Sequence, residues 1–357
     1  MVSPDFLDKM RERNGTVYKV EDDHTGGLQH WPEAPQVLLH RMQLKLEHVL
    51  LGKQAVIRQT ITALLAGGHV LLEDIPGVGK TVLAQGIARV MGGEFRRIQF
   101  TSDMVPADVI GGVVLERGSG ELVYRPGPII ANVVLADEIN RTSPRTQSAL
   151  LEAMEERTVS IEGETHRLPD PFMLIATQNP LSFQGTSPLP EAQLDRFLMR
   201  LSIGYPEADA EERLLEQYAE GNRQDPARLR PVITPPEWLR MQKEAAQTHM
   251  HHALMEYMVR VAEATRRSPE LALGLSPRAL RDWLRAAQAG AYMEGRGYVI
   301  PDDLLATAEP VLAHRLAFRS GMSGAEGMRD GSLLAAIVRE TPFPREAGAG
   351  FGGRRAR

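Results

Sequence analysis

The chain has 357 residues, of which 43% are hydrophobic, and it carries a formal net charge of −5 and no cysteine. This length allows one large domain or two to three ordinary ones, and the apolar content suffices for a sizeable buried core. The lack of cysteine excludes a disulfide framework, Cys-ligated zinc and a thiol nucleophile, and it favours a reducing compartment. The mildly acidic charge argues against a dedicated nucleic-acid binder.

The N-terminal region carries no sign of a targeting or spanning segment. It lacks a basic start followed by an apolar run, and no stretch of the chain approaches the roughly eighteen apolar residues of a membrane span. We therefore expect a cytoplasmic protein that is neither exported nor embedded. Residues 1–35 mix charges with Gly and show no sustained period, which predicts a poorly ordered arm.

From Val37 the apolar residues recur at helical spacing until Gly52, which predicts a helix that leads into the first domain, 36–205. Short apolar runs follow, and most of them suit strands that are buried on both faces of a parallel sheet. Helical patterns at 82–91 and 146–156 separate them, so the predicted fold class is α/β. The five expected strands are 69–72, 97–100, 133–136, 173–176 and 198–203.

Two segments with β-prone residues around Gly, 113–124 and 158–166, predict hairpins that interrupt this alternation. After Pro206 long amphipathic segments predict a helical second domain, 206–344, with helices over 207–220, 253–266, 277–294 and 301–318. The last residues, 345–357, are rich in Gly, Ala and Arg, and we expect them to be disordered.

The first candidate site lies where the run 71–72 passes into a glycine-rich loop that ends in Lys80 and Thr81. In such a loop the backbone N–H groups surround phosphates, the Lys reaches the β- and γ-phosphate oxygens, and the Thr hydroxyl binds Mg²⁺. The general pattern has Gly six residues before the Lys, where this chain has Asp74. The alternative is an ordinary turn between a strand and a helix. The candidate nucleotide-binding residues are Asp74, Pro76, Gly77, Val78, Gly79, Lys80, Thr81 and Val82.

The run 133–136 ends in two carboxylates, Asp137 and Glu138. Parallel strands of one sheet present their C-terminal ends together, and ligands of open α/β sheets bind there. Asp137 is a candidate Mg²⁺ ligand together with Thr81, and Glu138 is a candidate to polarise a water molecule for attack on the γ-phosphate. A strand end with two solvated acids is the alternative.

Three further polar residues are candidates for the same chemistry. Asn179 follows the run 173–176 and is placed to hold the attacking water, although Asn-Pro is also plain turn chemistry. Arg196 lies at the rim of the first domain, where it can reach a neighbouring subunit's nucleotide or remain a surface charge. Arg278 begins a helix behind Ser276 and Pro277, where a cation opposes the helix dipole unless an anion compensates it.

These residues lie within segments that resemble the MoxR family of AAA+ ATPases. The resemblance covers roughly Val37 to Pro344 and is most specific at 137–141, 147–157, 176–180 and 188–197. It implies an αβα core with a five-stranded parallel sheet, a C-terminal α-helical lid, ATP and Mg²⁺ as cofactors, and assembly as a ring, expected to be a homo-hexamer. In family terms Lys80 and Thr81 belong to Walker A, Asp137 and Glu138 to Walker B, Asn179 to sensor 1, Arg196 to the arginine finger and Arg278 to sensor 2, which in related proteins swings toward a neighbour's site.

The resemblance implies an ATP-hydrolysing chaperone that remodels, matures or activates a protein client, with a partner that bears a von Willebrand factor A domain. The alternative is a nucleic-acid motor, because related ring ATPases with similar hairpins include helicases. The tip of the second hairpin carries Glu162 and Glu164, which repel phosphates. The sequence therefore favours a protein client over nucleic acid.

Overall fold

The computed structural model describes residues 33–116, 120–179, 189–221, 225–319 and 332–343. The predicted C-terminal tail and nearly all of the predicted N-terminal arm lie outside the described residues. The fold begins at Pro35, where the unit Pro35–Arg357 starts with a helix, two residues before the predicted one.

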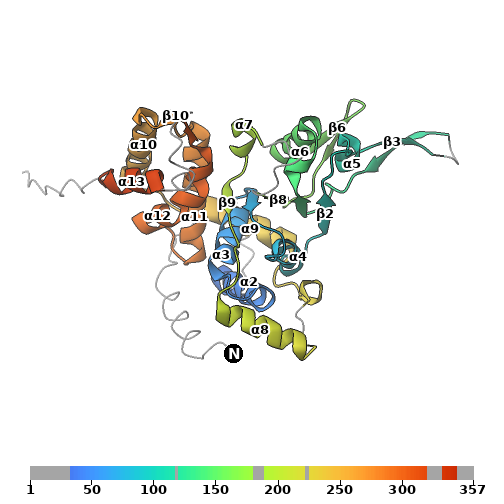
Figure 1. The fold of residues 1–357 in the computed structure, drawn as a ribbon, viewed down its shortest axis with the longest axis horizontal. Coiled ribbons are helices and arrows are strands. Elements are labelled where there is room, and N and C mark those ends of the chain that lie inside the picture. The colour runs from blue at the N-terminus through green and yellow to red at the C-terminus, as the bar shows by residue number, and fades with distance from the viewer. Residues whose placement is uncertain (1–32, 117–119, 180–188, 222–224, 320–331, 344–357) are drawn as a thin grey trace, which may run out of the picture. The chain divides into compact units, whose positions relative to one another are not determined.

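A five-stranded parallel sheet forms the centre of the first domain (Figure 1). Its strand order is β2-β5-β8-β1-β9, so β1 lies between β8 and β9. All five predicted strands are present, and the predicted fold class is confirmed. The strand β2, at one edge, differs from the other four in having exposed residues, which are Arg96, Arg97 and Gln99. The strands are β1 Val70–Glu73, β2 Phe95–Gln99, β5 Val133–Asp137, β8 Met173–Gln178 and β9 Met199–Leu201.

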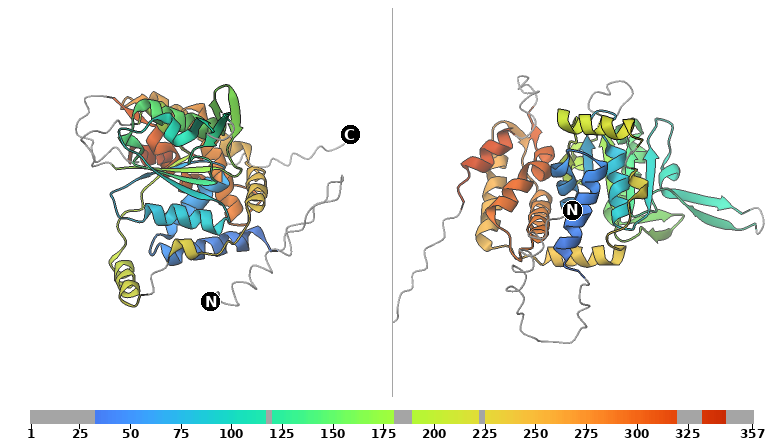
Figure 2. Two further views of the ribbon diagram at one scale, coloured as in Figure 1. Left: turned by 90° about the vertical axis from the view of Figure 1, so that its right-hand side faces the viewer. Right: turned by 90° about the horizontal axis from the view of Figure 1, so that it is seen from below.

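Helices lie on both faces of this sheet (Figure 2). Because successive strand residues point to opposite faces, Val134, Ala136 and Leu174 pack in one core cluster with Leu150 and Met154 of α6. Helix α6 begins two residues before the predicted pattern, with Ser143 as its cap and Pro144 in the first turn. The helices of this domain are α2 Pro35–Val49, α3 Gln54–Leu65, α4 Lys80–Val90, α5 Pro106–Ile110, α6 Pro144–Glu156 and α7 Glu191–Leu194, with a 3₁₀ turn η1 at Ile139–Arg141.

Both predicted hairpins are present. The first pairs β3 Gly111–Leu115 with β4 Leu122–Pro126, and the second pairs β6 Thr158–Ile161 with β7 Glu164–Arg167. The second turns through Glu162 and Gly163, both at positive φ (50° and 84°), as a two-residue hairpin turn requires. The Tyr124 ring of the first hairpin stacks on the His166 ring of the second at 4.0 Å, so the two hairpins contact each other.

The second domain is helical, as predicted. Its core contains Trp238, Tyr257 and Trp283, all fully buried, and the Trp283 indole N–H donates to the Leu304 carbonyl. The helices are α8 Ala208–Ala219, α9 Pro235–Ala246, α10 His252–Arg267, α11 Pro277–Met293, α12 Pro301–Leu312 and α13 Ser332–Glu340, with 3₁₀ turns η2 Pro226–Arg228 and η3 Ala313–Arg315.

The predicted helix over 301–318 was too long. Helix α12 ends at Leu312, because the chain turns through η3 and enters a short strand, β11 Ala317–Phe318, which pairs with β10 Leu271–Leu273. Among the helices of the described ranges, none combines the length and the apolar character that crossing a membrane requires.

Candidate nucleotide site

The loop between β1 and α4 has the backbone of a phosphate cradle. Gly77 and Gly79 lie at φ 89° and 102°, a region that glycine adopts without strain. Gly79 is the N-cap of α4, and no side chain caps the first-turn N–H groups of this helix, so they remain available to an anion. Pro76 and Gly77 are exposed, Val78 is buried, and Thr81 and Val82 are half-buried in the first turn of α4.

Lys80 is held inside this loop. Its Nζ donates to the Asp74 carbonyl at 2.8 Å. Burial lowers the pKa of Lys80, while the nearby carboxylates of Asp137, Asp74 and Glu138 act to raise it. A bound phosphate would add negative charge at the same place, so the loop holds a partly desolvated cation that an anionic ligand stabilises.

Asp74, which departs from the general Walker pattern, has a structural explanation. Its side chain is 5% exposed and accepts hydrogen bonds from the N–H groups of Ile203 and Gly204 and from the Ser202 hydroxyl. The carboxylate therefore ties the start of the loop to the chain that follows β9. Asp74 contacts the predicted nucleotide-binding residues through its backbone carbonyl, which accepts the hydrogen bond from Lys80.

Asp137 ends β5 beside this loop. Its Oδ1 accepts a hydrogen bond from the Thr177 hydroxyl at 2.7 Å, and its Oδ2 is paired with the Arg97 guanidinium at 2.6 Å. Thr177 comes from β8 and Arg97 from β2, the two strands that flank β5. The carboxylate is thus fixed from both sides.

Glu138 follows at φ 58° and ψ 50°, a left-handed conformation that is uncommon for a residue other than glycine. Its N–H donates to the Thr177 hydroxyl, and its Oε2 contacts Gln99 Nε2 at 3.3 Å and Arg141 Nε at 3.0 Å. Non-glycine residues in such conformations are concentrated at functional sites. Arg141, at the end of η1, is thus an ion-pair partner of Glu138.

The donor groups at this place suit Mg²⁺. Thr81 offers a hydroxyl and Asp137 a carboxylate, and hard oxygen donors are what this cation prefers. Among the described residues, no cluster of three or more His, Cys, Asp and Glu side chains forms a metal cage. Mg²⁺ characteristically binds through one or two protein ligands together with water and substrate phosphates, so a sparse site fits it.

Asn179 follows β8 directly and is half-buried. Since β8 lies between β5 and β1, its carboxyl end stands between Asp137 and the loop. We call this end of the sheet, where β1, β5 and β8 finish, the carboxyl edge. The structure brings Lys80, Thr81, Asp137, Glu138 and Asn179 to this edge, as predicted.

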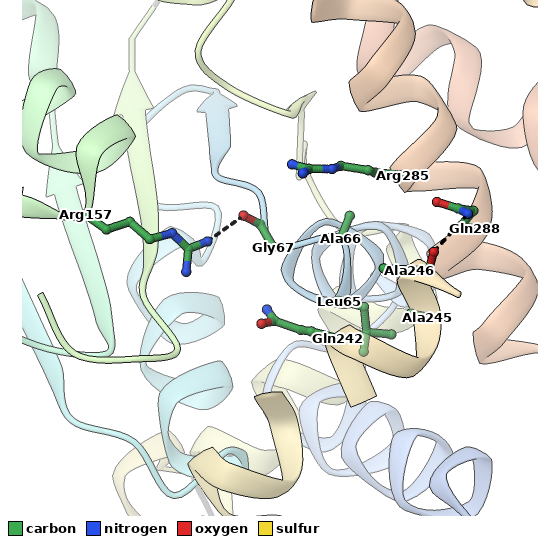
Figure 3. Close-up of a pocket in the computed structure, with 9 residues that line it drawn as sticks. All are labelled: Leu65, Ala66, Gly67, Arg157, Gln242, Ala245, Ala246, Arg285 and Gln288. Atoms are coloured by element: carbon green, nitrogen blue, oxygen red, sulfur yellow. Dashed lines mark hydrogen bonds between the residues drawn. The ribbon is translucent and has the colours of Figure 1, made fainter. Parts of the chain in front are cut away.

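Arg196 and Arg278 lie at the opposite end, the amino edge. Just beyond Arg196, the Leu198 N–H donates to the carbonyl of His69, the residue before β1. Arg157, the residue after α6, donates to the carbonyl of Gly67, also before β1. Figure 3 shows this bond beside a cavity of about 170 Å³.

The two predicted arginines share one carboxylate at this amino edge. Glu155, in the last turn of α6, accepts Arg278 NH1 on Oε1 at 2.8 Å and Arg196 Nε on Oε2 at 3.2 Å. The four residues of β1 alone separate the two edges by about 13 Å. In this structure Arg278 is therefore grouped with the predicted finger and away from its own chain's phosphate loop.

Comparison with known proteins agrees with these features. The ATPase family associated with various cellular activities (AAA) matches residues 69–199, and the AAA lid domain matches residues 263–336. Chaperone MoxR1 of Mycobacterium tuberculosis is 43% identical over 287 residues, 78% of this chain and 75% of that protein. This chain belongs to the MoxR family of AAA+ ATPases. Uncharacterized protein YeaC of Bacillus subtilis is 45% identical over 303 residues, 85% of this chain and 92% of its own.

A solved structure of this kind has the same fold. The crystal structure of a Cytophaga hutchinsonii protein superposes with a TM-score of 0.80 at 31% identity, and the match covers 87% of this chain and 96% of the other. As a MoxR-family AAA+ ATPase, the protein binds and hydrolyses ATP.

In this MoxR-family chain, a buried arginine of the lid joins the surroundings of Arg196 to those of Arg278. Arg315, 1% exposed at its side chain, donates through NH2 to the Phe197 carbonyl at 2.7 Å and to Asp282 Oδ2 at 2.8 Å, and its Nε lies 3.4 Å from Asp195 Oδ1. Burial raises the pKa of Asp195, which Arg315 counteracts. Asp195 and Phe197 flank Arg196, whereas Asp282 lies one helical turn after Arg278.

Sequence reasoning missed the partners of the predicted residues. Their roles come from contacts with residues distant in the sequence, so motif spacing gave no signal for most of them. A signal existed for one: Gln99 is the next-to-last residue of the predicted strand 97–100, near the same edge as Asp137, and could have been included on topology alone. The missed residues are Arg97, Gln99, Glu155, Thr177 and Arg315.

Proposed function

We propose that this ATPase works as a head-to-tail ring, expected to be a hexamer, in which each nucleotide is hydrolysed between two subunits. The observation that carries the proposal is the separation of the two predicted arginines from the phosphate loop. Arg196 and Arg278 pair with Glu155 at the amino edge, while Lys80, Asp137 and Glu138 lie at the carboxyl edge. A complete set of catalytic groups then needs the amino edge of a second subunit.

In this proposal each residue has a distinct task. The backbone of 77–81 and Lys80 hold the phosphates, and Thr81 and Asp137 hold Mg²⁺, which supplies positive charge against the phosphate oxygens. Glu138 accepts the proton of the attacking water, Asn179 orients that water, and the products are ADP and phosphate. Arg196 and Arg278 of the adjacent subunit stabilise the negative charge of the transition state.

A mixing experiment tests the shared site. Lys80→Ala is expected to abolish ATP binding, and Arg196→Ala is expected to bind ATP but hydrolyse it about a thousandfold more slowly. Mixed together, the two variants should hydrolyse ATP well above the sum of their separate rates, because Lys80→Ala subunits supply the arginine to intact phosphate loops. Normal hydrolysis by Arg196→Ala at every protein concentration would disprove the role in trans.

The matched control mixes Lys80→Ala with Glu138→Gln. Both changes damage the carboxyl edge, so no interface in that mixture contains a complete site, and the rate should stay at the background level. Equal recovery in this control would show that recovery does not report a shared site.

The proposed client is a protein, which the resemblance of this chain to chaperones such as MoxR1 supports. Leu115 and Leu122, 65% and 74% exposed, face each other across the first hairpin and offer an apolar surface. The tip of the second hairpin carries Glu162 in the turn and Glu164 at the start of β7, and both disfavour a nucleic-acid track.

The client and its partner are best sought by capture. Glu138→Gln protein held in ATP should retain a protein, in our proposal one that acts with a von Willebrand factor A domain partner, and Lys80→Ala should not. Recovery of nuclease-sensitive nucleic acid in place of a protein would contradict a protein client and favour a motor.

A further inference from the structure

We propose that Glu155 is a latch: it holds Arg196 and Arg278 within their own subunit and releases them to the nucleotide of a neighbouring subunit. This inference rests on the proposed role of the two arginines in trans. It adds a regulatory residue, which was not among the predicted site residues, that sets how readily a subunit completes its neighbour's site.

The geometry of the three side chains supports a latch. Each oxygen of the Glu155 carboxylate takes a different guanidinium, at 2.8 Å and 3.2 Å, and the two arginines come from different domains. All three side chains are about one-third exposed (35%, 30% and 27%). Ion pairs of this exposure are weak, so a stronger anion can displace the carboxylate.

The charges favour such an exchange. One carboxylate faces two guanidiniums, and Arg278 Nε is buried without a hydrogen-bond partner among the described residues. A terminal phosphate carries more charge and more acceptor oxygens than a carboxylate, and guanidinium pairs readily with phosphate. The arginines thus gain contacts when they leave Glu155 for a phosphate.

The exchange can be local because the backbone beneath both arginines is fixed. Arg315 ties Asp195 and Phe197, on either side of Arg196, to Asp282, one turn beyond Arg278. Release therefore requires rotation of two side chains, while the domains that carry them remain joined.

The test is Glu155→Gln, which keeps the shape of the side chain and removes its charge. ATP hydrolysis is measured over a range of protein concentrations at saturating ATP. The variant should reach half-maximal specific activity at a protein concentration about three- to tenfold lower than the unaltered protein, because two weak ion pairs no longer oppose assembly of the shared site. This difference should shrink as salt is added, since salt screens exposed ion pairs.

Glu156→Gln is the matched control. Glu156 is exposed, follows Glu155 in the same helix, and is in none of these pairs, so its replacement should leave the concentration dependence unchanged. An unchanged or higher half-maximal concentration for Glu155→Gln would overturn the latch. A lower maximal rate at saturating protein would also overturn it, because Glu155 would then position the arginines productively.

A second measurement keeps the latch separate from the shared site. A double-mutant cycle on thermal stability, with Glu155→Gln and Arg278→Ala in dilute protein, should give a favourable coupling that high salt removes. If mixing Lys80→Ala with Arg196→Ala restores no hydrolysis although Glu155 and Arg278 are coupled, the arginines do not act in trans, and the latch is refuted with that role. Successful mixing without coupling would refute the latch alone.

Discussion

Asp74 shows that a residue can differ from the general Walker pattern while the phosphate loop keeps its backbone conformation. The general Walker pattern has glycine here, but this residue does not need a positive φ in this chain, and the carboxylate instead accepts hydrogen bonds from the chain after β9. Hydrogen bonds from backbone N–H groups to a buried carboxylate belong to the stronger class. Asp74 in place of glycine therefore gives up backbone flexibility at this position, and its carboxylate joins the start of the loop to the chain after β9.

Restoring the motif should therefore harm the protein. Asp74→Gly leaves the N–H groups of Ile203 and Gly204 without their acceptor, and we expect unfolding free energy to fall by about 2–4 kcal/mol together with weaker ATP binding. Urea denaturation and nucleotide titration measure both effects. Asp74→Asn keeps an acceptor oxygen and should lose less, and a Gly variant as stable as the unaltered protein would contradict the anchor.

At the scale of elements, pattern and turn chemistry located the sheet strands and both hairpins. Apolar runs such as 133–136 are buried on both sides, and the Gly-containing turns lie where two β-prone segments must reverse. The end of α12 was beyond this reasoning, because an amphipathic pattern continues to Phe318 while pairing with β10, over forty residues earlier in the chain, decides the conformation. Glu155 and Thr177 were missed for the same reason: each acts through residues from another strand or helix.

The base of the first hairpin offers a test at this scale. A Cβ on Gly127 would stand 2.3 Å from the Gly111 nitrogen and 2.3 Å from the Val109 carbonyl oxygen, so the backbone must shift. Gly127→Ala should increase hydrogen exchange over 111–116 and 120–126 about tenfold or more, while the sheet stays protected. Gly112→Ala, whose added Cβ meets only Ala107 at 3.8 Å, is the control, and equal exchange in both variants would argue against a tightly packed base.

For the whole molecule, the junction of core and lid depends on Arg315. This arginine is 1% exposed and pairs with Asp282, itself 7% exposed, and with the Phe197 carbonyl of the core. The lid also contacts α3, where Gln242 donates to the Leu64 carbonyl. The buried Arg315 and Asp282 charges favour this one arrangement of core and lid, because either charge left buried without the other would be costly.

Removing that arginine should weaken the molecule as a unit. Arg315→Ala leaves Asp282 and Asp195 without their buried cation, and we expect a loss of about 3–5 kcal/mol in unfolding free energy by chemical denaturation. Arg281→Ala removes an exposed partner of the same Asp282 and should cost below about 1 kcal/mol. Equal losses of unfolding free energy in the two variants would show that the buried Arg315–Asp282 pair stabilises the protein no more than the exposed Arg281–Asp282 pair does.

The position of the two edges also determines which symmetry an assembly can use. In an isologous dimer one patch meets its own copy, so the two edges could meet each other only if both lay within that single patch. In the proposed ring the amino edge of one copy instead meets the carboxyl edge of the next through a heterologous contact, which repeats until rotation closes it. Each subunit would then act on one neighbour and be acted on by the other, which gives the assembly a direction.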